Sequence, residues 1–251
     1  MDITNRNNFY YLRHSFRKNG KVTHREKYLG KKIPDNIIIM EQNFLRMCLN
    51  EDAFIKINKI KKEFLIEWKR FPESIKKKNL IDLSINFTYN SNAIEGSTIT
   101  LDETKDLIER KISPNKKPFD ETIETKNHSK VFFNVIQDNE NINLEKIKKW
   151  HYDLFIDTKK DIAGQIRDYS VRVGDYRAPD WQDLQDLLTN FFVWLNKNKQ
   201  IMHPIELAAR AHYKFEKIHP FGDGNGRIGR FIIVNILFNY NFPILIIDYN
   251  K

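Results

Sequence analysis

Twelve consecutive residues near the end of this 251-residue chain, His219–Arg230, combine a base, an acid, glycines and two arginines. Their order is H-P-F-G-D-G-N-G-R-I-G-R, and the apolar run Phe231–Leu237 follows directly. Glycines allow the backbone to come close to phosphate oxygens, and the apolar run predicts that the loop opens onto the N-terminus of a helix, where anions bind. The segment therefore predicts a site for a nucleotide triphosphate.

The charged side chains of this loop fit such a ligand. Arg227 and Arg230 are three residues apart, so they project from neighbouring positions on the first helical turn and can hold successive phosphates. Asp223 can hold Mg²⁺, and a neutral His219 beside the phosphates can take the proton of an incoming hydroxyl as a general base. The alternative interpretation is a glycine-rich turn with solvated arginines.

The same twelve residues match H-x-F-x-[D/E]-G-N-G-R-x-x-R, the signature of the Fic family, at every fixed position, and the chain resembles that family from roughly Leu80 to its end. The resemblance implies a protein adenylyltransferase, which transfers AMP from ATP to a Ser, Thr or Tyr hydroxyl of a target protein. It makes His219 the catalytic base and places Mg²⁺ on Asp223, between the α- and β-phosphates.

The resemblance also assigns the contacts to the phosphates. The backbone of Gly224 and Gly226, with Asn225 between them, forms the anion hole, while Arg227 and Arg230 hold the β- and γ-phosphates.

A second motif, Ser91–Gly96, reads S-N-A-I-E-G and closes a helix predicted over about 74–96. Helical angles place Ser91 and Glu95 on one polar stripe, and Glu95 falls in the last turn, where the helix dipole disfavours a carboxylate. An arginine from elsewhere would compensate; the alternative is an ordinary exposed glutamate before the terminating Gly96. The motif resembles the Fic inhibitory motif [S/T]-x-x-x-E-[G/N], which implies that Glu95 pairs with Arg230, blocks the γ-phosphate and inhibits the enzyme in cis.

Between Gly164 and Pro179 the helical pattern is interrupted. The segment Tyr169–Tyr176 alternates like a short hairpin arm, which by itself predicts only a surface hairpin. The sequence A-G-Q-I-R-D-Y-S-V-R-V-G resembles the Fic flap, a β-hairpin that holds the target by adding it as an extra strand. The resemblance makes Val171 and Val173 target-docking residues.

Two departures from the family accompany these motifs. Position 222 is Gly, where larger residues are common, and this loosens the loop. The chain also ends soon after the signature helix, whereas Fic cores usually continue with another helix.

The fold is predicted to be mainly α, with a Fic-type helical domain over 34–251 that contains the inhibitory helix and a short β-hairpin flap. An N-terminal β-hairpin appendage is predicted over 1–33, because β-prone runs flank Asn19-Gly20, a dipeptide favoured in two-residue turns. This appendage packs on the body or contacts a partner or nucleic acid. Helical spacing of apolar residues occurs near 35–70, 74–94, 101–111, 119–138, 143–157, 180–198, 204–219 and 225–239. The helix from Pro204 carries an apolar stripe that delivers His219 at its inward end.

Composition narrows the class of protein. The chain has 42 Lys and Arg against 33 Asp and Glu, a net charge of +9, but the excess is diffuse and its densest stretch, Lys56–Lys78, is typical of a solvated helix face. Cys48 stands alone in an apolar helical pattern, so we expect a core residue and neither a disulfide framework nor a cysteine metal site. The longest apolar run is too short to cross a bilayer. We therefore predict no membrane association and a cytoplasmic location.

Several functions remain open at this point. With Glu95 positioning a water, the same site could remove AMP from a modified protein, making the enzyme de-AMPylating or bifunctional. A Doc-like kinase is disfavoured because that branch has Lys where this chain has Gly226. In another class, the chain would be a basic nucleic-acid-binding regulator with an inactive Fic core, which the intact signature disfavours. Predicted partners are ATP, Mg²⁺ and a target protein, with self-AMPylation and a homodimer as further predictions.

Overall fold

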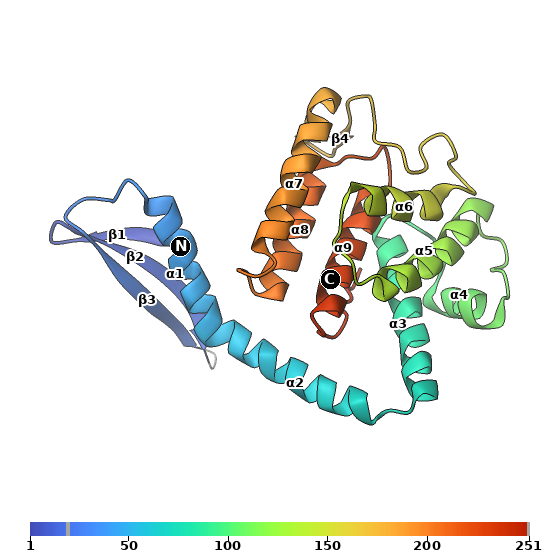
Figure 1. The fold of residues 1–251 in the computed structure, drawn as a ribbon, viewed down its shortest axis with the longest axis horizontal. Coiled ribbons are helices and arrows are strands. Elements are labelled where there is room, and N and C mark those ends of the chain that lie inside the picture. Colours follow the sequence, from blue (N-terminus) through green and yellow to red (C-terminus); the bar gives the residue numbers. More distant parts are fainter. Residues whose placement is uncertain (19–20, 250–251) are drawn as a thin grey trace. The chain divides into compact units, whose positions relative to one another are not determined.

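The computed structural model describes residues 1–18 and 21–249, and most of them lie in helices (Figure 1). They form two compact units, Met1–Glu63 and Phe64–Lys251. The predicted hairpin turn at Asn19-Gly20 lies outside the described residues, and the predicted domain boundary between residues 33 and 34 stays a prediction. Within the described ranges, no helix has both the length and the apolar character that crossing a bilayer requires.

The first unit is built on a three-stranded antiparallel sheet. The strands are β1 (Asp2–Arg6), β2 (Phe9–Lys18) and β3 (Lys21–Gly30), in the spatial order β1-β2-β3. The predicted hairpin corresponds to β2 and β3, whereas β1 is an addition that the sequence pattern did not indicate. Its residues are almost all exposed on both faces, so this edge strand lacks the alternation of apolar and polar residues that marks a half-buried strand.

Helix α1 (Ile37–Leu49) gives this sheet a small core. Phe44 and Cys48, four residues apart on one helix face, are buried together with Leu12 of β2 and Leu29 of β3. Cys48 is thus a buried core residue, as predicted.

The remaining helices follow the predicted segments closely. Their bounds are α2 (Ile55–Arg70), α3 (Glu73–Ile94), α4 (Leu101–Lys105), α5 (Phe119–Gln137), α6 (Leu144–Phe155), α7 (Leu184–Asn198), α8 (Pro204–Ile218) and α9 (Asn225–Asn239). Two predicted helices are interrupted. The segment near 35–70 is divided into α1 and α2 by a π-helical turn at Asn50–Phe54, and α4 continues into a π-helical turn at Asp106–Arg110. Apolar spacing does not reveal one extra residue in a single turn.

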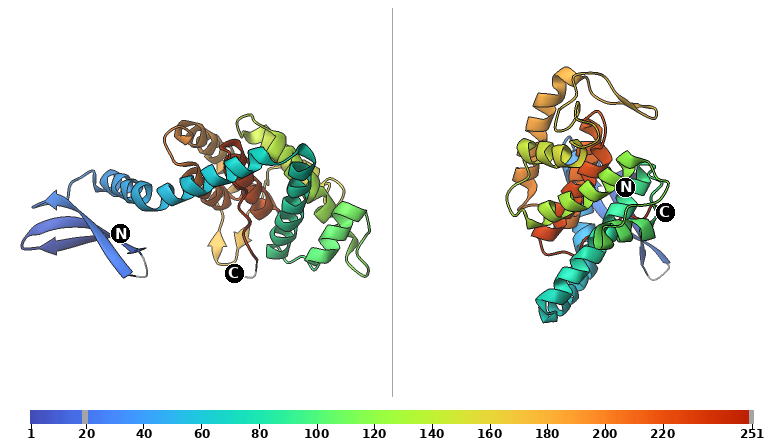
Figure 2. Two further views of the ribbon diagram at one scale, coloured as in Figure 1. Left: turned by 90° about the horizontal axis from the view of Figure 1, so that it is seen from below. Right: turned by 90° about the vertical axis from the view of Figure 1, so that its right-hand side faces the viewer.

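Helix α9 is the centre of the second unit, with α3, α5, α6 and α8 packed around it (Figures 1 and 2). Nearly every residue from its first turn to Leu237 is buried, which is the pattern of a core helix rather than an amphipathic surface helix. Its Phe231 ring lies 4.6 Å from the ring of His128 on α5 and 5.8 Å from that of Phe87 on α3. These contacts bring α3 and α5, two helices from distant parts of the sequence, against the first half of α9.

A tight connection joins α8 to α9. Helix α8 starts with Pro204 at its first position, as predicted, and ends where His219 adopts a left-handed conformation with φ of 50°. Gly224, with φ of 75°, precedes the first residue of α9. These two left-handed residues allow one helix to end and the next to begin within a short loop, so that α8 and α9 pack side by side.

A short hairpin projects from the helices between α6 and α7. Strands β4 (Arg172–Val173) and β5 (Tyr176–Arg177) pair antiparallel across Gly174 and Asp175 (Figure 2). The predicted β-hairpin in this interval is confirmed.

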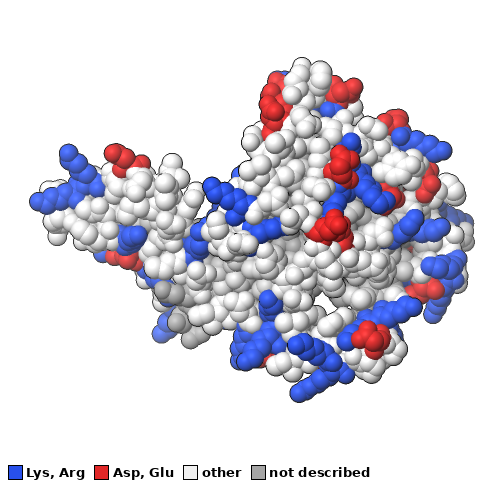
Figure 3. All heavy atoms as spheres, viewed as in Figure 1, with Lys and Arg blue, Asp and Glu red and all other residues white. Residues whose placement is uncertain are grey.

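Charged side chains are spread over the surface. On the face shown in Figure 3, Lys and Arg side chains are scattered and acidic side chains lie among them. This agrees with the diffuse basic excess of the sequence.

We predict that Asn235 fastens α9 to the end of α5. Its buried Nδ2 donates to the carbonyl oxygens of Val135 and Asp138, both at 3.0 Å. Replacing it in Asn235→Leu leaves two carbonyls without this donor and should lower the free energy of unfolding by about 2 kcal/mol. Urea unfolding followed by circular dichroism measures this.

The matched control is Asn198→Leu, whose Nδ2 donates only to the carbonyl of Trp194 one turn earlier in the same helix. It should change stability by less than about 0.5 kcal/mol. If the two variants lose the same free energy of unfolding, the hydrogen bonds of Asn235 between α9 and α5 do not stabilise the fold more than a bond within one helix.

Candidate active site

The loop between α8 and α9 is held by its own hydrogen bonds. Asn225 is 2% exposed; its Oδ1 accepts from the Phe221 N–H at 2.9 Å and its Nδ2 donates to the Phe221 carbonyl at 2.8 Å. The side chain of Asn225 therefore fixes the loop from inside, while the backbone of Gly224–Gly226 forms the start of α9. Two further anchors come from outside the loop, His151 and Arg167.

His151 on α6 contacts two residues of the loop and holds it in place. Its Nδ1 accepts from the Gly164 N–H at 2.9 Å, and its Nε2 lies 3.0 Å from the Asp223 carbonyl oxygen. Burial lowers the pKa of His151 to about 4, so the ring is neutral and its Nε2–H donates to Asp223. Stacking on Phe221, with centroids 3.9 Å apart, completes the support.

His219 lies at the end of α8 with a largely buried side chain. The Arg167 guanidinium anchors this position, because its Nε donates to the His219 carbonyl at 2.8 Å. Burial lowers the pKa of His219, and the backbone of Glu216, which accepts a hydrogen bond, acts in the opposite direction. The imidazole is therefore neutral near pH 7 and free to accept a proton.

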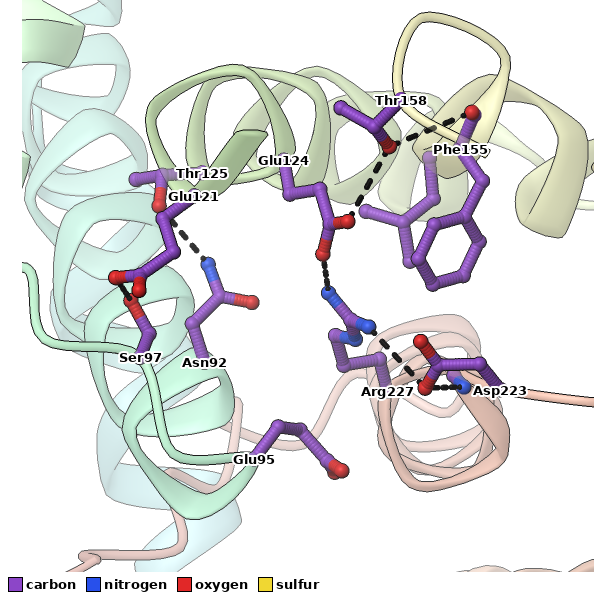
Figure 4. A network of polar contacts seen from close by, with 12 residues as sticks. Asn92, Glu95, Ser97, Glu121, Glu124, Thr125, Phe155, Thr158, Asp223 and Arg227 are labelled. Atoms are coloured by element: carbon purple, nitrogen blue, oxygen red, sulfur yellow. Dashed lines mark hydrogen bonds and ion pairs between the residues drawn. The ribbon is translucent and has the colours of Figure 1, made fainter. Parts of the chain in front are cut away.

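Asp223 and Arg227 belong to a network of four charges, and Figure 4 shows three of them, Glu124, Arg227 and Asp223. Arg227 Nη1 donates to Glu124 of α5, and Arg227 Nη2 lies 3.6 Å from Asp223 Oδ1. Lys159, in the turn after α6, donates to Asp223 Oδ2 at 2.7 Å and lies 3.1 Å from Glu124 Oε1. Burial alone would lower the pKa of Lys159, but the two carboxylates raise it, so the ammonium stays charged.

Arg230 is tied to the end of α3 by three hydrogen bonds. Its Nε donates to Ser91 Oγ at 2.8 Å, and its Nη2 donates to the Ser91 carbonyl at 2.9 Å and to Glu95 Oε1 at 2.5 Å. The arginine is 6% exposed, whereas the Glu95 side chain is 32% exposed. Glu95 ends α3, and Gly96 follows with φ of 91°. The structure thus brings together Glu95 and Arg230, which the sequence analysis expected to form a pair.

Two glycines of the loop leave room for side chains from other elements. A Cβ on Gly226 would stand 2.3 Å from Glu95 Oε1, so a glycine here allows Glu95 to lie over the loop. A Cβ on Gly222 would stand 2.0 Å from the hydroxyl of Tyr169. The departure from the family at position 222 therefore has a local reason, since Tyr169 of the segment before the hairpin occupies that space.

Val173 lies in β4, the first strand of the hairpin, and Val171 comes just before that strand. The carbonyl of Val171 accepts from the Ala178 N–H at 3.2 Å, and Val173 in β4 is 47% exposed. The hairpin is attached to α8 through Tyr176, whose hydroxyl donates to the Lys217 carbonyl at 2.7 Å.

A cavity of about 330 Å³ opens beside these groups, and we call it the acidic cavity. Its volume is that of a small-molecule site. It is lined by Asn92, Glu95, Gly96, Ser97, Asp120, Glu121, Glu124, Lys159, Asp223 and Arg227. The cavity therefore lies between the loop, the C-terminal end of α3 and the N-terminal part of α5.

The residues of this cavity fit a metal that is only partly held by protein. Among the described residues, no three His, Cys, Asp or Glu side chains gather as a metal centre. Mg²⁺ is commonly held by one or two carboxylates, with substrate phosphates and waters as its other ligands. Asp223 suits that role, with Oδ1 accepting from the Gly224 N–H at 2.5 Å and Oδ2 facing Lys159.

Comparison with known proteins identifies the fold. The model of the Fic/DOC family matches residues 141–237, which span α6 to α9 and include the loop. These residues are similar to a Fic/DOC family domain. The resemblance seen in the sequence is thereby confirmed, and so is the mainly helical Fic fold with its small hairpin.

The curated relatives that this chain resembles are longer proteins. The chain is 37% identical over 171 residues to a Nematostella vectensis protein named protein adenylyltransferase Fic, covering 64% of this chain and 39% of that protein. A Culex quinquefasciatus protein of the same name is 33% identical over 169 residues, covering 65% of this chain and 34% of that protein. The chain thus spans well under half the length of these curated relatives.

Solved structures agree on the fold. A Fic-domain-containing signaling protein from Bacteroides thetaiotaomicron superposes with a TM-score of 0.67 at 27% identity, covering 76% of this chain and 77% of that one. Fic-1 from C. elegans gives a TM-score of 0.71 at 22% identity, covering 86% and 67% of the two chains. The second likeness shows the fold alone.

Sequence reasoning missed the residues that reach the loop from other elements. These are Glu124, His151, Lys159 and Arg167. His151 is a polar residue on an otherwise apolar face with Ile147 and Leu154, which is a usable sequence signal. Glu124 shares its face with other polar residues, Glu121 and Asn127 among them, so apolar spacing does not distinguish it. Lys159 and Arg167 lie in irregular segments rich in charged residues, where nothing local distinguishes them.

We predict that Glu216, beside His219 on α8, destabilises the fold when it is ionised. Burial raises the pKa of Glu216 to about 7, and its Oε1 is buried without a hydrogen-bond partner. The pKa of Glu216 is higher in the folded than in the unfolded chain, so its contribution to stability is fully present below the unfolded pKa. That contribution is lost as the pH rises through the folded pKa of about 7. Glu216→Gln should therefore stabilise the chain by about 2 kcal/mol at pH 8 and by less than about 1 kcal/mol at pH 5.

Chemical denaturation at the two pH values measures the difference, with exposed Glu109→Gln as the control that should not depend on pH. If the gain from Glu216→Gln were as large at pH 5 as at pH 8, ionisation would not be its cause.

Proposed function

We propose that this chain is a protein adenylyltransferase that transfers AMP from ATP to a Ser, Thr or Tyr hydroxyl of a target protein. The observation that carries the proposal is the grouping of His219, Asp223, Arg227 and Arg230 at one end of the buried helix α9, where Asp223 and Arg227 line the acidic cavity. The name of the longer relatives supports the same activity.

In the proposed reaction, the target hydroxyl oxygen attacks the α-phosphorus of ATP while its proton passes to the neutral imidazole of His219. The bond from the α-phosphorus to the bridging oxygen of the β-phosphate breaks, and pyrophosphate leaves. The backbone N–H groups of Asn225 and Gly226, in the first turn of α9, would bind phosphate oxygens at the helix N-terminus, where the dipole favours anions. When bound, Mg²⁺ supplies positive charge to the phosphates, and Asp223 would hold it.

We further propose that the chain inhibits itself through Glu95. The γ-phosphate needs Arg230, but Arg230 already donates to Glu95 and Ser91. A hundred-fold repression requires the paired state to be favoured by roughly 2.8 kcal/mol, which a largely buried, hydrogen-bonded ion pair can supply. Release of Glu95 then allows ATP to bind productively.

The target is proposed to dock as an extra strand on the hairpin. Val173 lies in its first strand with Val171 just before it, and Val173 is about half exposed, so its side chain is available to a partner. Main-chain pairing would hold the target with little dependence on its sequence, and this segment would present the hydroxyl to His219. Self-AMPylation, a homodimer and a cytoplasmic location remain predictions.

A second function is favoured by the place of Glu95 itself. Its carboxylate lines the acidic cavity, and one oxygen binds Arg230 while the side chain stays about one third exposed. A carboxylate in this position can hold a water that attacks the phosphorus of the AMP adduct and accept its proton. The bond from phosphorus to the side-chain oxygen then breaks, which releases AMP and restores the hydroxyl. Release of AMP from a modified target is therefore the alternative activity.

We expect His219→Ala to abolish transfer while it leaves ATP binding nearly unchanged. General-base catalysis contributes about 10²- to 10⁴-fold, and the phosphate contacts do not involve the imidazole. Because burial lowers the pKa of His219, transfer by the parent chain should fall only as pH drops below 6.5. Labelling of cell lysate with labelled ATP measures transfer, and calorimetry measures binding.

His212→Ala serves as the control, since His212 lies two turns earlier on the same helix and outside the loop. Undiminished labelling by His219→Ala would sink the assignment of the base.

We expect Glu95→Gly to raise labelling of itself and of target protein by about 100-fold, because Arg230 is freed for the γ-phosphate. Glu95→Asp should give a partial effect, since its shorter side chain reaches Arg230 poorly. Initial rates at saturating ATP provide the measurement, and Glu109→Gly, far from the motif in sequence, controls for loss of a surface charge.

If Glu95→Gly labels no more than the parent, autoinhibition is wrong. Loss of AMP release from a modified target in that variant would support the hydrolytic role instead.

A further inference from the structure

Lys159 is a cation placed against two carboxylates, Asp223, which the proposed reaction uses, and Glu124. The turn after α6 fixes its backbone, since its N–H donates to the Phe155 carbonyl at 2.8 Å. Its ammonium lies 4.9 Å from the centre of the Phe155 ring, 2.7 Å from Asp223 Oδ2 and 3.1 Å from Glu124 Oε1. The ammonium thus occupies a point between two acidic oxygens at the edge of the acidic cavity.

This point is where a divalent cation would bind. Asp223 uses Oδ1 within the loop, where it accepts from the Gly224 N–H, so Oδ2 is the oxygen left for a metal. Glu124 presents Oε1 to the same point, while its Oε2 accepts from Arg227. Two carboxylate oxygens from separate elements are a common partial ligand set for Mg²⁺ or Mn²⁺.

The charges of the network are already balanced. Asp223 and Glu124 carry two negative charges, and Lys159 and Arg227 carry two positive charges. A divalent ion at Asp223 Oδ2 would meet an ammonium at contact distance, and the repulsion at an effective dielectric constant of about 20 is several kcal/mol. Metal and ammonium therefore compete for the same oxygen.

We propose that Lys159 occupies the metal position of the nucleotide-free chain, so that a divalent cation binds Asp223 only when phosphates compensate its charge. The proposal rests on the proposed function in that it takes Asp223 as the metal ligand. Lys159 is then a positioning residue that couples metal entry to nucleotide entry.

The test measures Mn²⁺ binding to the nucleotide-free chain by electron paramagnetic resonance of the free ion. Lys159→Met keeps the apolar stem and removes the charge, so it should tighten Mn²⁺ binding by about tenfold or more. Lys159→Arg should leave the affinity weak, and so should Lys160→Met, the exposed neighbour. Adding Asp223→Asn to Lys159→Met should remove the gain, which locates the ion at Asp223.

Calorimetry with ATP adds a second readout. Lys159→Met should reach half-maximal ATP binding at a lower Mg²⁺ concentration than the parent. Unchanged Mn²⁺ affinity in Lys159→Met would overturn the proposal. Weaker ATP binding in that variant at every Mg²⁺ concentration would also overturn it, since Lys159 would then be a phosphate ligand.

These measurements need no turnover, so they separate two failures. If Lys159→Met binds Mn²⁺ more tightly but the parent chain transfers no AMP, the proposal for Lys159 stands and the proposed function is refuted. Active transfer with no change in Mn²⁺ affinity would do the reverse.

Discussion

Two buried guanidinium groups at the start of α9 set the requirement that the surrounding structure meets. Arg227 and Arg230 are 4% and 6% exposed, and they lie at a helix N-terminus whose dipole is already positive. Buried charges are costly unless they are paired and hydrogen-bonded. Helix α5 supplies Glu124 to Arg227, and α3 supplies Ser91 and Glu95 to Arg230. The packing of α3 and α5 on α9 therefore serves charge compensation as well as burial of apolar surface.

The same compensation explains why a nucleotide would have to displace groups of the chain. Each cation that a phosphate needs already has a carboxylate partner, and the carboxylate that a metal needs already has Lys159. Nucleotide binding then replaces existing ion pairs with new ones, because the charged side chains already have partners. Such exchanges have small net free energies because similar interactions are lost and gained. A modest change at Glu95 or Lys159 can therefore shift the balance between the closed and the nucleotide-bound forms.

The sequence predicted what is encoded locally. The His219–Arg230 loop could be recognised because its residues are consecutive, and α3 with Glu95 at its end followed from apolar spacing and a terminating glycine. Strand β1 escaped because an exposed edge strand has no apolar alternation. Glu124 and Lys159 escaped because their partners lie 103 and 64 residues away in the chain. Long-range ion pairs leave no periodic signal, and only the packing of α5 and α6 on α9 brings them to the loop.

The central claim is that Glu95 and the γ-phosphate compete for Arg230, and comparing the affinities for ATP and ADP tests it most directly. Calorimetry would be carried out on Glu95→Gly and on the chain with Glu95 intact, both carrying His219→Ala to prevent turnover. ADP lacks the γ-phosphate, so the account predicts that Glu95→Gly tightens ATP binding markedly and leaves ADP binding almost unchanged. An equal change for both nucleotides, or none for either, would contradict it.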